Sequence, residues 1–247
     1  MSTDPVATPA ARRFGVRATL AFIALLIAAV PFGAIVLLLR EKVGWLRRLD
    51  VGAAQHLHNF DESHPAFVTV MRAITNSGAP RVWIVVLGLL TLWLLVRRMY
   101  RLAIFVPVTG LGSSLLNDTI KTLVGRTRPV LENPIATATG KSFPSGHTQS
   151  AIVGYGILVL IFLPVIAARW RRWVIALAML MVLLVGFSRI ALGVHYVSDV
   201  VGGLLIGGAW LMAQTAAFSA WRRDSKLPPV DPERGLEPEG ARRLKGG

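Results

Sequence analysis

The feature that most constrains this chain is a series of long apolar runs without a single charge. Three runs, at residues 18–39, 148–168 and 200–220, hold 22, 21 and 21 residues. At about 1.5 Å of rise per residue, a helix of that length crosses a hydrocarbon layer of about 30 Å. Three shorter runs of 15 or 16 residues, at 82–96, 102–117 and 173–188, are each joined to a neighbour by a tight basic turn. The three long and three short runs therefore predict six membrane spans. Each span is expected to be a helix, because a single segment in lipid can satisfy its backbone hydrogen bonds only as a helix.

The composition excludes most soluble classes of protein. Hydrophobic residues make up 53% of the chain and charged residues only 16%, which leaves too few charges for a surface that faces water everywhere. The chain has no cysteine, so disulfide frameworks, thiolate metal sites and cysteine nucleophiles are excluded. The predicted fold class is all-α: a six-transmembrane helical bundle with an outer interfacial helical segment.

Basic residues at the ends of the spans predict the orientation of the bundle. Six crossings bring four basic clusters to the same side of the membrane, and they comprise Arg12, Arg13 and Arg17; Arg97, Arg98 and Arg101; Arg169, Arg171 and Arg172; and Arg222, Arg223 and Lys226. The positive-inside rule makes that side cytoplasmic. A conflicting basic group at residues 40–48 falls on the outer side, where Glu41 and Asp50 partly offset it. The four agreeing clusters decide the prediction, which is a multi-pass protein of the cytoplasmic membrane.

The same features divide the chain into segments. Residues 1–17 form a cytoplasmic N-terminal segment, and residues 18–224 form the six-span domain with an outer segment at about 40–80. The first apolar run exceeds the 7–15 residues of a signal peptide, so an uncleaved anchor is expected. Residues 225–247 are rich in proline, glycine and charge, and we expect a disordered cytoplasmic tail.

Three polar clusters fall on the predicted outer side, at residues 121–129, 143–147 and 188–199. They would bring together Lys121, Arg128 and Arg189 without a matching group of acids. Such a pocket favours an anion, and phosphate suits the arginine fork. Ser145 and Gly146 begin a helix whose first amides also favour an anion. The alternative is that these cations only reach the lipid headgroups along the surface.

Two histidines in these clusters could act on a bound anion. Asp199 follows His195 by four residues, a spacing that places the carboxylate beside the imidazole on a helix or a turn. A carboxylate on one ring nitrogen fixes the tautomer and leaves the other nitrogen as a nucleophile or a base. His147 would then be free to donate a proton to a leaving oxygen. The alternative for the His195–Asp199 pair is a helix cap with a buried polar contact.

These segments resemble the signature of the type 2 phosphatidic acid phosphatase superfamily, which also includes the vanadium haloperoxidases. Lys121 with Arg128-Pro129 matches Lys-x₆-Arg-Pro, residues 144–147 match Pro-Ser-Gly-His, and residues 188–199 match Ser-Arg-x₅-His-x₃-Asp. The resemblance implies a metal-independent phosphatase without a cofactor. In it, His195 attacks phosphorus to form a phosphohistidine, Asp199 orients His195, and His147 protonates the leaving alkoxide. The implied phosphate-binding residues are Lys121, Arg128, Ser145, Gly146 and Arg189.

The leading hypothesis is therefore an integral-membrane lipid phosphate phosphatase that acts at the extracytoplasmic face on a phosphomonoester or a pyrophosphate. Candidate substrates are polyprenyl pyrophosphate, phosphatidate and phosphatidylglycerol phosphate, and the choice among them stays open, as does the oligomeric state. Two alternatives are a vanadate-dependent haloperoxidase-like oxidoreductase and a non-catalytic lipid-binding membrane protein. Membrane lipids are the expected partners. Nucleic acid is not, because the cations lie at span ends where lipid headgroups explain them.

Overall fold

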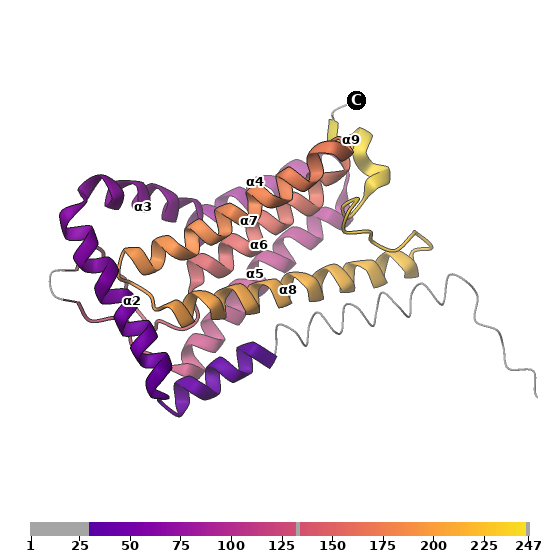
Figure 1. Ribbon diagram of the computed structural model, residues 1–247. Coiled ribbons are helices and arrows are strands. Elements are labelled where there is room, and N and C mark those ends of the chain that lie inside the picture. The colour runs from indigo at the N-terminus through magenta and orange to yellow at the C-terminus, as the bar shows by residue number, and fades with distance from the viewer. Residues whose placement is uncertain (1–29, 132–133, 246–247) are drawn as a thin grey trace, which may run out of the picture.

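The computed structural model describes residues 30–131 and 134–245, and within them the regular structure is helical apart from one isolated bridge between Asp231 and Gly235 (Figure 1). A first helix covers Val30–Arg40. The further elements are α2 (Gly44–Ser63), α3 (Pro65–Ser77), α4 (Pro80–Val96), α5 (Tyr100–Val124), α6 (Gly146–Phe162), α7 (Ala168–Ala191), α8 (Val197–Asp224) and α9 (Ala241–Lys245), with short 3-10 turns at Leu163–Val165 and Pro238–Gly240. The predicted all-α class is confirmed.

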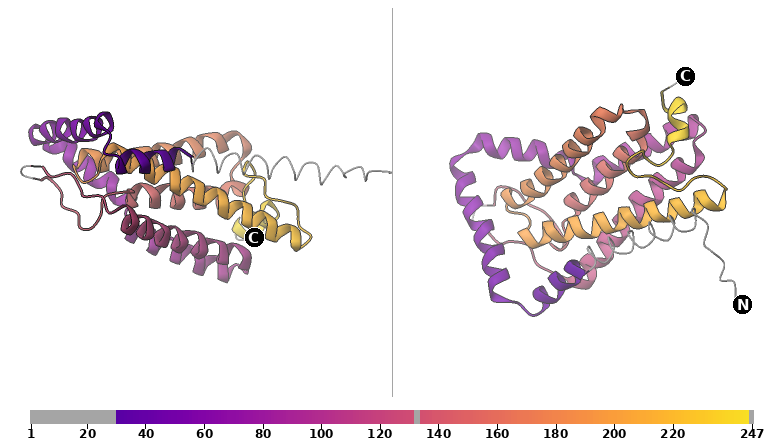
Figure 2. Two further views of the ribbon diagram at one scale, coloured as in Figure 1. Left: turned by 90° about the horizontal axis from the view of Figure 1, so that it is seen from below. Right: turned by 45° about the vertical axis from the view of Figure 1, so that its right-hand side comes forward.

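Helix α6 lies at the centre of the bundle and contacts α4, α5, α7 and α8. Its core is apolar: Leu94 of α4, Leu102 of α5 and Ile157 of α6 are completely buried. Helix α2 lies across one end of the bundle, where it contacts α7 and α8, and α3 returns along α7 (Figures 1 and 2). The outer segment predicted at about 40–80 is thus a helical element at one end of the bundle.

Four stretches of the described chain are long and apolar enough to cross a membrane: Pro65–Val96, Gly146–Val165, Ala168–Ala191 and Val197–Asp224. They contain the predicted runs at 82–96, 173–188 and 200–220 and most of the run at 148–168. The run at 102–117 forms the middle of α5, whereas the run at 18–39 lies mostly outside the described residues, as does the predicted segment 1–17. The count of six spans therefore stays a prediction.

The C-terminal segment differs from the disordered tail that its composition predicts. Val230, Leu236 and Leu244 are buried, and the amide of Leu236 donates to the carbonyl of Leu160 at 3.0 Å. Arg222 of α8 is buried and donates to Glu239 at 2.6 Å. Residues 225–245 thus pack on the end of the bundle opposite α2 (Figure 1). The physical reason is that three scattered apolar side chains find a surface to bury against, which local composition does not reveal.

Local sequence signals set where α5 ends and where α6 begins, at the end of the bundle that α2 crosses. Helix α5 stops at Gly125, whose left-handed backbone (φ 67°) lets its amide donate to the carbonyl of Lys121. Helix α6 begins after Ser145, whose hydroxyl caps it. Gly203 lets α8 approach α6 closely, since a Cβ there would lie 2.8 Å from the carbonyl oxygen of Ser145. The end of α5 and the starts of α6 and α8 therefore meet at one place.

Candidate active site

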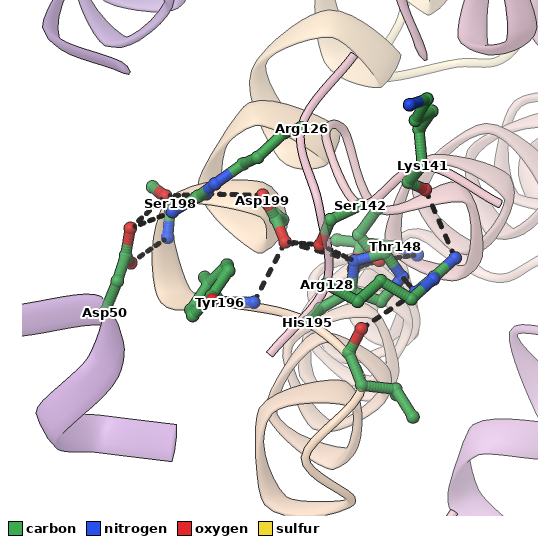
Figure 3. Close-up of polar contacts among 12 residues, drawn as sticks. Asp50, Arg126, Arg128, Lys141, Ser142, Thr148, His195, Tyr196, Ser198 and Asp199 are labelled. Atoms are coloured by element: carbon green, nitrogen blue, oxygen red, sulfur yellow. Dashed lines mark hydrogen bonds and ion pairs between the residues drawn. The ribbon is translucent and has the colours of Figure 1, made fainter. Parts of the chain in front are cut away.

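The three predicted polar segments meet at this end of the bundle (Figure 3). The amide of Ser145 donates to the carbonyl of Asp199 at 2.9 Å, which joins the second segment to the third. Arg128 of the first segment donates to the carbonyl of Val194 at 2.8 Å, which joins the first to the third. Residues as far apart in sequence as Arg128 and Val194, which are separated by 66 positions, thus lie together, and the three segments meet as the sequence predicts.

His195 and Asp199 form a buried pair. Nδ1 of His195 lies 3.3 Å from Oδ2 of Asp199, and the two residues are 2% and 0% exposed. On its other side, Nε2 of His195 lies 3.0 Å from Nη1 of Arg128. A guanidinium has only donors, so Nε2 must be the acceptor and Nδ1 must carry the hydrogen that points to Asp199. This tautomer directs the lone pair of Nε2 at the guanidinium of Arg128.

The carboxylate of Asp199 is held through both oxygens. Oδ2 accepts from the hydroxyl of Ser142 and, at 2.9 Å, from the amide of Tyr196, in addition to His195. Oδ1 accepts from Arg126 at 2.6 Å. Charge-assisted bonds of this kind are the strong ones in proteins. A carboxylate with so many donors keeps one orientation, which in turn fixes the ring of His195.

Arg128 is held in place by backbone carbonyls. It donates to the carbonyl oxygens of Thr139 and Gly140, both at 3.1 Å. It also donates to the carbonyl oxygen of Lys141 at 3.2 Å (Figure 3). The loop that leads to α6 therefore wraps around this guanidinium. Because carbonyls are uncharged, they orient the cation without cancelling its charge, and the charge stays available for an anion at Nε2 of His195.

The remaining predicted phosphate-binding residues lie around the start of α6. A Cβ on Gly146 would lie 3.5 Å from Nζ of Lys121, so this helix start faces the lysine. The hydroxyl of Ser145 accepts from Thr148 Oγ1 at 3.0 Å and from the Thr148 amide at 3.5 Å, as a helix cap does. Arg189 is 7% exposed and donates to Thr75 of α3 at 2.8 Å, and its Nε has no partner among the described residues. A buried guanidinium with a spare donor suits an anion.

His147 lies in the first turn of α6, next to these groups. Its imidazole is within electrostatic range of four of them: Arg189, His195, Lys121 and Arg128. The structure therefore gathers all eight residues singled out in the sequence around one region. The histidines come from different elements, His147 from α6 and His195 from the turn before α8.

The comparison with protein families agrees with this arrangement. The sequence model of the PAP2 superfamily matches residues 99–223, which is half of the chain and includes all eight candidate site residues. The chain belongs to the PAP2 superfamily. Together with the four apolar stretches, this makes it a multi-pass membrane protein.

Three PAP2 relatives are named for the phosphates that they hydrolyse. Phosphatidylglycerophosphatase B of Bacillus subtilis is 36% identical over 96 residues (38% of this chain, 46% of that protein). Lipid A 4'-phosphatase of Bacteroides thetaiotaomicron is 30% identical over 141 residues (52% and 59%), and undecaprenyl-diphosphatase of Sulfolobus acidocaldarius is 29% identical over 147 residues (58% and 66%). The matched part thus spans between 46% and 66% of these relatives.

The PAP2 fold extends over most of the chain. A crystal structure described as that of the first transmembrane PAP2 type phosphatidylglycerolphosphate phosphatase from Bacillus subtilis superposes with a TM-score of 0.71. The superposition covers 84% of this chain and 98% of that one, at 22% sequence identity. At this identity the likeness concerns the fold alone.

Several further residues lie in the candidate site without a signal in the sequence that assigns them to it. Arg126 lies inside the first motif at a position that the family pattern leaves unspecified, and the sequence indicates Asp50 only as a charge that offsets neighbouring cations. Ser142 and Ser198 match no position of the motifs. Arg126 and Ser142 bond to Asp199, whereas Ser198 precedes Asp199 in the chain and bonds to Asp50 (Figure 3). A second arginine two residues before Arg128 was the one available signal. Nothing local points from Asp50 to a residue 149 positions later.

The burial of His195 predicts the acidic side of the pH profile. Burial lowers the pKa of His195 to about 4, although the hydrogen bond and the charge of Asp199 act to raise it. The nucleophilic role expected of His195 requires the neutral ring, so activity should be lost only as the pH falls through this lowered value. We expect the acidic limb of kcat/KM, corrected for ionisation of the substrate phosphate, well below pH 6.5. A corrected limb at pH 6.5 or above would show that the free enzyme's histidine has an ordinary pKa.

Proposed function

We propose that this protein is a lipid phosphate phosphatase that works through a phosphohistidine on His195. The observation that carries the proposal is the orientation of His195: Nδ1 bonds to Asp199 while the lone pair of Nε2 faces Arg128. A nucleophile aimed at a cation is suited to an anionic electrophile, and phosphoryl transfer depends mainly on such positioning and charge.

The reaction has two balanced steps. A phosphate group binds among Arg128, Lys121 and Arg189, and Arg128 transfers its donor from Nε2 to a phosphoryl oxygen. Nε2 then forms a bond to phosphorus as the ester P–O bond breaks, and the leaving oxygen takes a proton from His147. In the second step His147 removes a proton from water, the water oxygen bonds to phosphorus, and the P–N bond breaks to release inorganic phosphate. Asp199 stabilises the charge on His195 throughout.

The proposed site faces the extracytoplasmic side. The basic turns, with the clusters at residues 97–101, 169–172 and 222–226, lie where α4, α6 and α8 end and where α5 and α7 begin. The site lies where α5 and α7 end and α6 and α8 begin. In an antiparallel bundle these are opposite ends, so the basic turns and the site lie on opposite sides. The positive-inside rule places the basic turns in the cytoplasm.

A cavity next to the site supports a lipid substrate. It has a volume of about 250 Å³ and lies between α4, α5 and α6, with walls that include Trp83, Leu87 and Val106. Ile84 and Leu111 also line it and are 59% and 58% exposed, as expected of side chains that face acyl chains. We propose that a hydrocarbon chain of the substrate occupies this cavity.

Buried polar side chains connect the cavity to the phosphate-binding residues. Ser113 lines the cavity and accepts from Gln149, which in turn accepts from Asn117 at 2.7 Å. Asn117 lies beside Gly146, where a Cβ would be 3.3 Å from its Oδ1. A lipid whose phosphate binds at Gly146 can therefore extend its hydrocarbon chain into the cavity.

Phosphate release by the full chain in detergent tests this proposal. The panel contains a polyprenyl pyrophosphate, phosphatidate, phosphatidylglycerol phosphate and a water-soluble alkyl phosphate, each with and without a chelator. We expect release from at least one lipid, faster than from the soluble ester and unchanged by the chelator. An enzyme that needs an added metal, or that does not distinguish lipids from the soluble ester, contradicts the proposed mechanism or the proposed use of the cavity.

A further inference from the structure

We propose that Asp50 of α2 and Arg126 are positioning residues that hold Asp199 in place and balance its charge, which makes the outer helix part of the reaction machinery. The inference rests on the proposed function, since it concerns how His195 is kept reactive. Asp50 lies outside residues 99–223, so the family match does not include it.

The geometry is a carboxylate–guanidinium–carboxylate chain (Figure 3). Nη2 of Arg126 lies 2.7 Å from Oδ2 of Asp50, and Nη1 lies 2.6 Å from Oδ1 of Asp199. Both carboxylates are fully buried, and the arginine side chain is 16% exposed. The guanidinium carbon also stacks on the ring of Tyr196, 4.1 Å from its centre. These contacts, with Asp50 of α2 on one side and Asp199 of α8 on the other, hold the guanidinium of Arg126 in one position.

Ser198 provides a second link between Asp50 and the start of α8. Its hydroxyl donates to Oδ2 of Asp50 at 2.6 Å, and its amide donates to Oδ1 at 3.0 Å. The amides in the first turn of a helix have no partner within the helix, so a carboxylate there stabilises the helix start. Because Ser198 directly precedes Asp199, this contact also fixes the backbone that carries Asp199.

The second carboxylate has an electrostatic purpose. A guanidinium 2.6 Å from Asp199, alone in a buried site, would cancel much of the negative charge that Asp199 presents to His195. Asp50 offsets Arg126 from the opposite side. Arg126 can then hold Oδ1 of Asp199 by hydrogen bonding while the group as a whole keeps one net negative charge next to Nδ1 of His195.

The charged and titratable groups around His195 come from several elements. Asp199 of α8, Arg128 of the loop between α5 and α6, and Arg189 of α7 act on it directly. His147 of α6 is within electrostatic range. Asp50 and Arg126 act on it through Asp199. Removing the charge of Asp50 should lower the pKa of His195, whereas removing the charge of Arg126 should raise it. A purely structural role predicts no such opposite shifts.

The test uses the full chain in detergent with the variants Asp50→Asn, Arg126→Gln and the double variant. Neither side chain is placed against phosphate, so we expect kcat to fall about 10- to 100-fold in each single variant with KM changed less than threefold. The acidic limb of kcat/KM should move to lower pH in Asp50→Asn and to higher pH in Arg126→Gln. In the double variant the limb should return toward that of the wild type, because both charges are gone.

Glu41→Gln is the matched control, because it neutralises an exposed acid of the same outer segment; it should leave kcat and the limb unchanged. If a charge variant fails to fold, as judged by gel filtration and melting temperature, Ser198→Ala takes its place; it weakens the hold on Asp50 and should lower kcat by a smaller factor. Active variants with a wild-type kcat, or limbs that move in the same direction, would overturn the inference. A wild-type protein that releases no phosphate from any lipid instead refutes the proposed function.

Discussion

Replacing His195 with glutamine lowers kcat by about 10⁴-fold or more on every phosphate ester that the protein hydrolyses. Glutamine keeps much of the volume and a polar tip, but it offers no nitrogen that can form a bond to phosphorus. Removing a nucleophile from an assembled catalytic group costs factors of this size. The measurement is steady-state phosphate release in detergent with the lipid for which the wild-type protein is most active.

The control for this substitution is His56→Gln, an exposed histidine of α2. It should leave kcat unchanged, and both variants should elute like the wild type in gel filtration. If His195→Gln retained more than about one percent of the wild-type rate while folded, His195 would not be the nucleophile. Asp199 would then have to be explained as a cap of α8 alone.

Replacing His147 with glutamine lowers kcat by a factor that depends on the leaving group. An alkoxide from a lipid phosphate is a poor leaving group and needs a proton, so we expect a loss of about 10²- to 10⁴-fold. The leaving group of p-nitrophenyl phosphate departs without a proton. With that ester, the first turnover should slow less than tenfold, and nitrophenolate should appear as a burst equal to the enzyme concentration. Stopped-flow absorbance measures the burst.

The burst separates the two roles proposed for His147. Hydrolysis of the phosphohistidine also needs His147, as the base that activates water, so the steady-state rate after the burst should remain low. An equal loss on the lipid and on p-nitrophenyl phosphate in the first turnover would contradict a role as proton donor. It would indicate instead that His147 binds the phosphate group.

The parts of the fold that the sequence predicts are those set by local length and spacing. The run at residues 102–117 predicts a helix, yet α5 continues to Val124 through Asp118 and Lys121. It continues because the end of a helix is set by its cap, here Gly125. The charged residues Asp118 and Lys121 interrupt the apolar run but do not stop the helix. The apolar run therefore predicts the place of the helix but understates its length by about two turns.

In the site too, the contacts that the sequence predicts are local, and the contacts that it does not predict depend on tertiary packing. His195 and Asp199 are four residues apart and share one turn, so their contact follows from the spacing. Asp50 reaches Arg126 across 76 residues because α2 lies over the ends of α7 and α8. Such a contact depends on tertiary packing, and a single acid among basic residues gives no local indication of it. The packed C-terminal segment escapes local prediction for the same reason.

The most direct test of the central claim is to find where the phosphorus goes. The full-length protein is mixed with a ³²P-labelled lipid phosphate, quenched with alkali within milliseconds to preserve phosphohistidine, and digested for peptide mapping. The account predicts label on the peptide that contains His195. In the His147→Gln variant, mixed instead with ³²P-labelled p-nitrophenyl phosphate, whose leaving group needs no proton, the label should approach one per protein because hydrolysis of the intermediate is slowed. Label on any other residue, or none in a preparation that turns the lipid over, would contradict it.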